Sequence, residues 1–500
     1  MPGVMHGGLE RAAAQSGEQV AILAGDAAST WTDLDGLANA AAHHLAGLGV
    51  GQGDRVAVML TNRLEFTTVV HGISKLGAAA ILLSPAWKAA EVGHAMSLTL
   101  PRVGVADGAG VEVLSGCLDA VLDLDDPETA AALGADRTPV DQPTIEPGDE
   151  SVLVFSSGTT GMPKAVRHTH ASMTTAIEHW VRALGLGADD RMQVATPPSH
   201  ILGLLNLLAA AAARATVRLH PRFDLDEVLR RIESDRVTIE MAVAPIALAM
   251  ANHPDLERHD LSSLRYIMWG ATPVTASVAE EVTRRTGVRW LPAYGASELP
   301  VLACNPQDRP DAWRLDSAGL PPDGVELRAA DLDTGEVLPA GEVGEIQARS
   351  ASAMAGYLPG DANADAFTAD GWYRTGDVGW LEAEGWVHLT DRAKEMIKVS
   401  GFQVAPAEIE AVLHGHPGVL DCAVFGIPDD RKGEVPAAAV LVEPDHPATP
   451  EELQQAVADA LATYKQLHHV VLVDAIPRLP SGKVLRRTLR DEWAAKLAAG

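Results

Sequence analysis

A short stretch rich in glycine and hydroxyl side chains constrains this chain more than any other. Residues 156–164 read Ser-Ser-Gly-Thr-Thr-Gly-Met-Pro-Lys and directly follow the apolar run 151–155, which is typical of a buried strand. Glycines let backbone N–H groups approach an anion, hydroxyls donate hydrogen bonds, and Lys164 adds a positive charge. The stretch therefore predicts a phosphate-binding loop at a strand end. A flexible connector is the competing interpretation.

This loop is not a Walker A loop. Lys164 follows Pro163 rather than a glycine, and no serine or threonine comes next.

Strands and helices alternate on both sides of the loop. Residues 55–60 and 81–83 read as strands, and a helix with Phe66, Val70 and Ile73 on one face lies between them. Strand, helix and strand form a βαβ unit, which implies a parallel sheet. The same order recurs later, with strands expected at 238–244, 265–268 and 288–291.

Three further local signals complete this region. Pro245 is expected to stop the strand 238–244, and Gly185 to end a helix that carries Met173 and Leu184. The most apolar stretch, 201–213, is interrupted by Asn206 and too short to span a membrane, so we expect a buried helix.

Three notable segments come where predicted strands finish, at 156–164, 269–273 and 293–298. The carboxyl ends of strands are where open α/β sheets bind ligands. Simple βα turns would explain the glycines, but not the co-occurrence of Lys164 and Glu298. A ligand site is therefore expected at this edge.

The character of the chain changes past about Lys394. A helix is expected at 406–414, and Thr449 with Glu452 forms a capping box at the start of another. Strands are expected at 422–425, 438–442 and 470–473. We therefore predict two domains, a large one over residues 1–393 and a small α+β one over 394–500.

Charge and cysteine content narrow the function classes. The 67 acidic and 39 basic residues give a net charge of −28, which argues against nucleic acid as a partner. Cys117, Cys304 and Cys422 are widely separated and odd in number, which argues against both a disulfide framework and a zinc site. A cytoplasmic protein is expected. The oligomeric state is left open, a homodimer included.

Seven segments, taken in order, resemble the adenylate-forming acyl-CoA synthetases, the superfamily that includes 4-coumarate–CoA ligases, luciferases and peptide-synthetase adenylation domains. They are 156–164, 198–203, 269–273, 294–298, 373–377, 391–398 with 401–406, and 480–483. Together they extend over most of the chain and are far more specific than any one of them alone.

The resemblance implies an α/β fold: a large N-terminal domain of parallel and mixed sheets with flanking helices, and a small mobile α+β C-terminal domain. It implies that a carboxylate reacts with ATP to give acyl-AMP and pyrophosphate, and that a thiol then displaces AMP. ATP, Mg²⁺ and coenzyme A are the implied cofactors, and a small carboxylic acid is the substrate. A carboxylate is already ionised at neutral pH, so the first step needs positioning and charge neutralisation rather than a general base.

The resemblance also assigns site residues by position. Lys483 bridges the attacking carboxylate and the α-phosphate, and Glu298 binds Mg²⁺. Tyr294 faces the adenine, and Asp377 with Arg392 binds the ribose. The other implied ATP-binding residues are Ser156, Ser157, Gly158, Thr159, Thr160, Gly161, Lys164, Gly270, Ala271, Thr272, Gly295, Ala296 and Ser297.

The resemblance assigns further residues to the second half-reaction, in which the thiol displaces AMP. Lys394 matches the hinge between the domains, and His200 lies beside the acyl carbonyl. Lys398 and Gln403 approach the site after the domain swings, with Ser400, Gly401 and Phe402 along the coenzyme A passage.

The implied acyl pocket is neutral and mostly apolar. It comprises Ser199, Gly203, Met268, Trp269, Ala271, Ala293, Leu299, Pro300 and Val301. Residues 197–206 contain no carboxylate to pair with a substrate ammonium, so a hydrophobic acid is favoured over an amino acid. The sequence does not choose between aryl and aliphatic acids.

Two departures from the family pattern bear on ATP use. Ala165 replaces the usual glycine after the loop lysine, which would add strain if that position needs positive φ, and Ser297 replaces a threonine. Three alternatives stay open: an acyl-AMP ligase that loads a carrier-protein phosphopantetheine, an enzyme specialised for one half-reaction, and a non-catalytic binding module.

Overall fold

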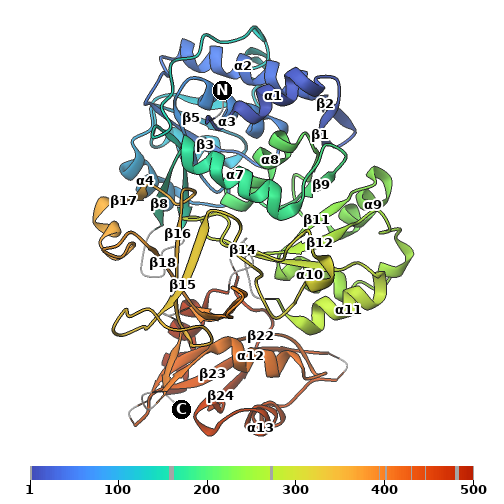
Figure 1. Cartoon of the computed structure of the whole chain (residues 1–500), viewed down its shortest axis with the longest axis vertical. Helices are drawn as coiled ribbons and strands as arrows, with labels where there is room; N and C mark the ends of the chain where they lie inside the picture. The colour runs from blue at the N-terminus through green and yellow to red at the C-terminus, as the bar shows by residue number, and fades with distance from the viewer. Residues whose placement is uncertain are drawn as a thin grey trace.

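The structure is a computed structural model of the chain. It describes residues 3–156, 163–270, 274–392, 395–399, 402–429, 431–444, 446–478 and 484–498. The amino terminus lies at one end of the long axis of the molecule and the C-terminal elements lie at the other (Figure 1).

Two large sheets form the body of the N-terminal part. Among the described residues, the first has seven strands, of which β4, β3, β5 and β6 are parallel while β8 pairs antiparallel with both β7 and β17. In spatial order its strands are β17 (Gly356–Leu358), β8 (Lys164–Thr169), β7 (Glu150–Ser156), β4 (Ala79–Leu82), β3 (Arg55–Met59), β5 (Val103–Ala106) and β6 (Val121–Asp123).

The second sheet has eight strands in the described part of the chain, and only its outermost pairs are antiparallel. In spatial order they are β14 (Ala303–Cys304), β13 (Trp290–Tyr294), β12 (Tyr266–Trp269), β11 (Ile239–Ala242), β9 (Arg191–Val194), β10 (Thr216–Leu219), β1 (Val20–Ala24) and β2 (Ala27–Thr30).

One apolar core joins the two sheets through the helices that pack between them. These helices are α1 (Gly7–Ser16), α2 (Trp31–Gly47), α3 (Leu64–Lys75), α7 (His170–Leu184) and α8 (Ile201–Ala213). The buried helix expected at 201–213 is α8. Gly185 caps α7 with a φ of 57°, as its position predicts.

The outer faces of the sheets have separate cores. α9 (Leu225–Asp235), α10 (Ala244–Ala251) and α11 (Ala276–Thr286) cover the second sheet. α4 (Ala89–Thr99) and α5 (Ala109–Ser115) cover the first, and α6 (Pro127–Ala132) follows β6.

The strand expected at 238–244 is shorter than predicted. β11 ends at Ala242, and Pro245 lies in the first turn of α10. A proline fits there because the N–H that it lacks has no intrahelical acceptor in a first turn. Pro245 therefore begins a helix rather than stopping a strand, and this prediction was wrong.

Below these sheets, four described strands form a third, antiparallel sheet: β15 (Val325–Ala330), β16 (Gly344–Ser350), β18 (Tyr373–Leu381) and β19 (Val387–Arg392). It lies between the large sheets and the C-terminal elements (Figure 1).

The C-terminal part is a small α+β unit, as predicted. Its elements are β20 (Ile397–Val399), β21 (Phe402–Val404), α12 (Pro406–His414), β22 (Val419–Asp429), β23 (Gly433–Val442), α13 (Pro450–Ala460), β24 (His469–Leu472) and α14 (Arg486–Ala498). The predicted capping box of Thr449 and Glu452 begins α13. Of the helices that the structure describes, none combines the length and apolar character that crossing a membrane requires.

Candidate active site

The predicted phosphate loop joins two antiparallel strands. Ser156 at the end of β7 lies opposite Lys164 at the start of β8, so the loop begins and ends at one point of the sheet. Its residues Ser157, Gly158, Thr159, Thr160 and Gly161 lie outside the described part of the chain. The strand β8 itself was not predicted.

The concern about Ala165 is resolved by this strand. Ala165 is buried in β8, where it pairs with Phe155 and Leu358, and it is not among the residues with positive φ. Alanine therefore adds no left-handed strain at this position.

Glu298 lies in a tight turn that follows β13. The N–H of Ala296 donates to the carbonyl of Leu299 at 3.0 Å, and a Cβ on Gly295 would lie 2.1 Å from the carbonyl oxygen of Pro300. Gly295 is thus required for the turn to close. The turn leaves Glu298 only 8% exposed, at the end of the strand that carries Tyr294.

Tyr294 and Asp377 meet across two sheets. The hydroxyl of Tyr294 donates to Oδ2 of Asp377 at 2.5 Å, and both side chains are buried. Asp377 is in β18, where it lies opposite Arg392 of β19. Residues predicted to contact the adenine and the ribose are therefore neighbours, although 83 positions separate them in sequence.

A tyrosine that the sequence analysis missed connects the lysine with the glutamate. The ammonium of Lys164 lies 5.1 Å from the ring centroid of Tyr357, and the hydroxyl of Tyr357 donates to Oε1 of Glu298 at 2.7 Å. Tyr357 belongs to β17, a three-residue strand with no recognisable apolar run. No local signal marks it, because its role follows from pairing with β8, about 190 positions away.

Two histidines contact the backbone next to Glu298 and next to Lys164. Nε2 of His168 in β8 donates to the carbonyl of Ser297 at 2.8 Å, and Nε2 of His94 in α4 lies 3.0 Å from the carbonyl of Pro163. Burial lowers the pKa of His168 to about 4, so its imidazole is neutral near pH 7. These contacts fix the turn with Glu298 and the end of the phosphate loop relative to the first sheet.

The predicted acyl-pocket residues do not all face the same way. Met268 and Trp269 are neighbours on β12 and belong to different cores, one between the sheets and one beneath α10 and α11. Trp269 packs on Trp290 with ring centroids 5.1 Å apart. A cavity on one face of the sheet therefore meets only one of these two side chains directly.

The remaining predicted acyl residues lie in two segments. Ser199, Leu299, Pro300 and Val301 are buried, and Ala293 is half-buried. Within the described part of the chain, the hydroxyl of Ser199 has no hydrogen-bond partner.

His200 directly precedes α8 as its N-cap, with an extended backbone (φ −90°, ψ 150°), and burial lowers the pKa of its imidazole. Gly203 allows α8 to lie close to the preceding loop, because a Cβ there would be 2.4 Å from the carbonyl oxygen of Pro197.

On the C-terminal side, Lys398 is exposed on β20, and its N–H donates to Glu434 at 2.9 Å. Gln403 of β21 lies opposite Lys398 in the same hairpin. Several predicted residues lie outside the described chain: Ala271, Thr272, Lys394, Ser400, Gly401 and Lys483. The predicted roles of Arg392 and Phe402 rest on their positions in the chain, and Gly270 is buried where β12 ends.

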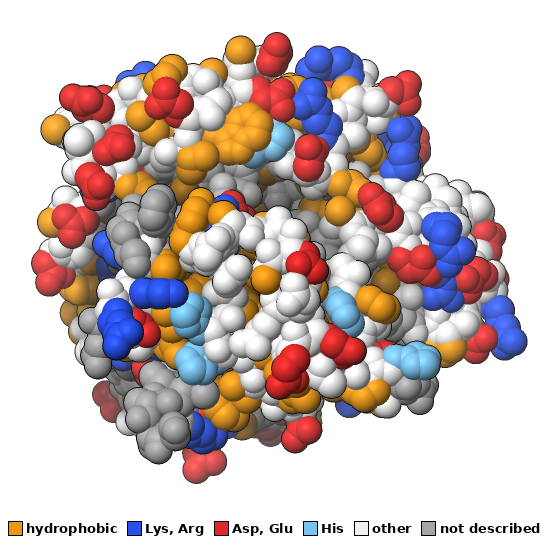
Figure 2. Space-filling model, turned by 90° about the horizontal axis from the view of Figure 1, so that it is seen from below, with side chains coloured by type: hydrophobic (Ala, Val, Ile, Leu, Met, Phe, Trp, Pro, Cys, Tyr) orange, Lys and Arg blue, Asp and Glu red, His pale blue; other side chains and the backbone are white. Residues whose placement is uncertain are grey.

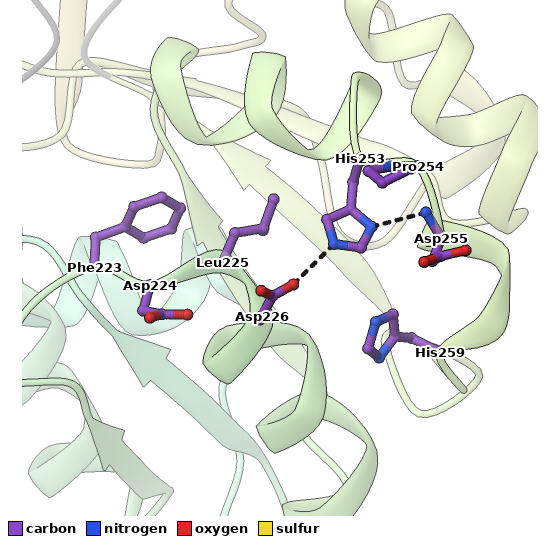
Figure 3. Close-up of a pocket in the computed structure, with 8 residues that line it drawn as sticks. All are labelled: Phe223, Asp224, Leu225, Asp226, His253, Pro254, Asp255 and His259. Carbon is purple, nitrogen blue, oxygen red and sulfur yellow. Dashed lines mark hydrogen bonds and ion pairs between the residues drawn. The ribbon is translucent and has the colours of Figure 1, made fainter.

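Two surface cavities lie apart from these residues. One of about 710 Å³ opens between the start of α9 and the loop after α10, where Nε2 of His253 bonds Asp226 at 2.9 Å (Figure 3). Another of about 410 Å³ includes Arg218, Arg222 and Arg230. Neither has a predicted site residue in its wall.

Comparisons with known proteins identify the family of the chain. The family model of the AMP-binding enzyme matches residues 9–358, and that of the AMP-binding enzyme C-terminal domain matches residues 408–483. Among curated relatives, the chain is 36% identical to "4-coumarate--CoA ligase 2" of Oryza sativa subsp. japonica, over 93% of this chain and 88% of that protein.

Solved structures resemble the chain over nearly its whole length. The anthranilate CoA ligase AuaEII in complex with anthranoyl-AMP superposes with a TM-score of 0.93 at 26% identity, over 100% of this chain and 99% of that one. ATP-bound MatB from Rhodopseudomonas palustris superposes with a TM-score of 0.92 at 25% identity, over 98% and 99%. The chain therefore belongs to the AMP-binding enzyme family, within the adenylate-forming acyl-CoA synthetase superfamily, and is an acid–thiol ligase of that family.

Proposed function

We propose that this enzyme uses ATP to convert a hydrophobic carboxylic acid into its acyl-AMP and then transfers the acyl group to coenzyme A, releasing AMP and pyrophosphate. The observation that carries the proposal is the convergence of Lys164, Tyr294, Glu298 and Asp377 through the Tyr294–Asp377 and Lys164–Tyr357–Glu298 contacts. Four residues from separate strands and turns present one cation, two carboxylates and one aromatic ring to a common region.

The chemistry of these groups fits a magnesium nucleotide. Mg²⁺ prefers oxygen ligands and takes one or two carboxylates together with phosphate oxygens. Glu298 supplies such a carboxylate, and Lys164 supplies a cation for the phosphates. When bound, Mg²⁺ neutralises phosphate charge as one anion approaches another. The residues of the chain bind and orient the two reactants, because no proton has to be removed from the acid.

The acid is proposed to be mostly apolar. Leu299 and Val301, which the sequence predicts for the acyl pocket, are buried and apolar, and the buried hydroxyl of Ser199 has no hydrogen-bond partner among the described residues. The identity to a protein named for 4-coumarate supports placing aryl acids first in a substrate panel. Transfer to a carrier-protein phosphopantetheine is the alternative acceptor, and competition between the two thiols distinguishes them.

The test is ATP–pyrophosphate exchange across a panel of aryl and aliphatic acids, followed by thioester formation with and without coenzyme A. Exchange that depends on a hydrophobic acid, with a thioester formed only when coenzyme A is added, supports the proposal. Absence of exchange with every acid of the panel contradicts it.

Lys483 gives a sharper test of the two half-reactions. Lys483→Ala should lower the rate of exchange by about 100-fold, as expected for loss of one cation that stabilises the transition state. Transfer from supplied acyl-AMP to coenzyme A should change far less, because that step does not involve the α-phosphate of ATP. Equal losses in both assays would refute this role. Lys496→Ala, which removes an exposed lysine of α14, is the matched control.

A further inference from the structure

Tyr357 lies between two groups of opposite charge. Its ring is under the Lys164 ammonium at 5.1 Å, and its hydroxyl donates to Glu298 at 2.7 Å. Among the residues that the structure describes, the Lys164 ammonium contacts the Tyr357 ring and forms no ion pair with a carboxylate. The ammonium and the carboxylate therefore each contact the tyrosine rather than each other.

The backbone determines this placement. Tyr357 lies opposite Val166 in the β17–β8 pair, and Lys164 is two residues before Val166, so all three side chains lie on one face of the sheet. The amide of Asn363 brackets the tyrosine: Oδ1 accepts from the N–H of Tyr357 at 2.7 Å, and Nδ2 donates to its carbonyl at 3.1 Å. Tyr357 is 9% exposed. Its position is thus fixed by the fold.

The turn that carries Glu298 is also bonded to the residues that directly precede Tyr357. The N–H of Met354 donates to the carbonyl of Glu298 at 2.8 Å, and the N–H of Ala355 donates to the carbonyl of Arg167 in β8 at 2.8 Å. Residues 354–357 therefore connect the strand of Lys164 with the turn of Glu298 through both backbone and side chain.

A lysine and a glutamate in a poorly hydrated site attract each other strongly. If Lys164 and Glu298 paired directly, the ammonium would be less available to phosphate oxygens. The carboxylate would likewise be less available to Mg²⁺. An interposed phenol prevents this contact while it offers its ring face to the ammonium and its hydroxyl to the carboxylate.

We propose that Tyr357 is a positioning residue that keeps Lys164 and Glu298 apart and oriented for a magnesium nucleotide. The inference rests on the proposed function, because it takes Lys164 as the phosphate contact and Glu298 as the magnesium contact. It adds that an uncharged aromatic spacer keeps both groups available before the nucleotide binds.

Calorimetric titration of ATP into the intact enzyme, with Mg²⁺ and with excess chelator, separates the contact of Tyr357 with Lys164 from its contact with Glu298. Tyr357→Phe keeps the ring, so affinity for metal-free ATP should be unchanged. The gain in affinity on adding Mg²⁺ should fall about tenfold, the effect of losing one hydrogen bond to a charged group. An unchanged gain would overturn the role of the hydroxyl.

Tyr357→Leu removes the contacts with Lys164 and with Glu298, and it lets these two charges pair. Affinity for metal-free ATP should then also fall, by roughly tenfold. Adding Glu298→Gln to Tyr357→Leu removes the competing carboxylate and should restore affinity for metal-free ATP toward the wild-type value. If it does not, Tyr357 acts only through packing, and the spacer role is wrong.

Tyr266→Phe is the matched control. Tyr266 is a buried tyrosine whose hydroxyl donates to the carbonyl of Leu184, so the variant loses a comparable bond. It should lower thermal stability without changing either ATP affinity. Glu298→Gln alone separates the two proposals. If it leaves the gain from Mg²⁺ intact, the magnesium role that the proposed function gives to Glu298 is wrong. A smaller gain in Glu298→Gln with an unchanged gain in Tyr357→Phe rejects only the spacer.

Discussion

Glu240 is a carboxyl group in the middle of β11 that is 1% exposed. Oε2 accepts from Nε2 of Gln193 in β9 at 2.9 Å, and Gln193 in turn contacts His220, which directly follows β10. Burial raises the pKa of Glu240 to about 8, whereas burial lowers the pKa of His220 to about 4. Near neutral pH this line of side chains therefore carries no charge.

The raised pKa has a definite consequence for stability. Between about pH 4.5 and 8 the folded chain retains a proton on Glu240 that the unfolded chain releases, so folding becomes less favourable as pH rises through this window. Glu240→Gln, which imitates the protonated form, should raise the free energy of unfolding by about 1 kcal/mol at pH 5 and about 3 kcal/mol at pH 7.

Chemical denaturation at several pH values measures this difference. The gap between variant and wild type should widen up to about pH 8 and then stay constant. A gap that narrows with rising pH would contradict the assignment. Glu384→Gln, at an exposed position, should show no such trend.

At the scale of elements, two helical glycines have opposite roles. A Cβ on Gly203 in α8 would lie 2.4 Å from the carbonyl oxygen of Pro197, whereas a Cβ on Gly93 in α4 would meet nothing within 4 Å. Gly203 thus fixes how closely the start of α8, with His200 before it, approaches the loop after β9.

Gly203→Ala should destabilise the protein by about 1–3 kcal/mol, the usual cost of overpacking. It should also alter the KM for the acid, because His200 and Ser199 move with the start of α8. Gly93→Ala should instead stabilise by about 1 kcal/mol, because alanine favours a helix. Thermal unfolding measures the stability of both variants, and steady-state kinetics with varied carboxylic acid measures the KM. A destabilised Gly93→Ala would contradict the comparison.

The elements also show what the sequence could and could not predict. β7, α7, α8 and α13 were predictable because apolar periodicity or a cap residue marks each of them locally. β8 was missed because Lys-Ala-Val-Arg-His-Thr has no apolar run, and β17 because it has three residues.

The site residues likewise fall into those that the sequence could predict and those that it could not. Lys164, Tyr294, Glu298 and Asp377 were predicted from motifs, and the structure brings Tyr294 to Asp377 and both Lys164 and Glu298 to Tyr357. Tyr357 and His168 could not be found, since their contacts with the Glu298 turn arise only when β8 and β17 pair. Periodicity likewise did not show that Trp269 would pack away from Met268.

At the scale of the whole molecule, a hydrogen bond crosses the predicted domain boundary. The N–H of Ala407, in the first turn of α12, donates to Oδ2 of Asp391 in β19 at 3.0 Å. The two residues lie on either side of Lys394, so a rotation at the predicted hinge would have to break this bond. Seen from below, the surface carries acidic side chains scattered among basic and apolar ones (Figure 2).

Lys394→Pro should separate the half-reactions. Proline fixes φ and so limits rotation at this position. Pyrophosphate exchange should stay within about twofold of wild type, whereas thioester formation should fall by roughly 100-fold, because only the second step requires the rotated arrangement. Lys394→Ala, which leaves φ free, should retain both. Equal impairment of both steps by the proline variant would argue against a hinge here.

The unequal burial of the three cysteines has a practical consequence. Cys304 and Cys422 are buried, and burial raises the pKa of Cys304 to about 12 and that of Cys422 as well, whereas Cys117 is exposed. Thiol-directed dyes react through the thiolate, so a maleimide fluorophore should attach at Cys117 without prior removal of the other two. A second dye on a cysteine introduced into α13 would make energy transfer a direct test of whether the C-terminal part changes its distance from Cys117 during turnover.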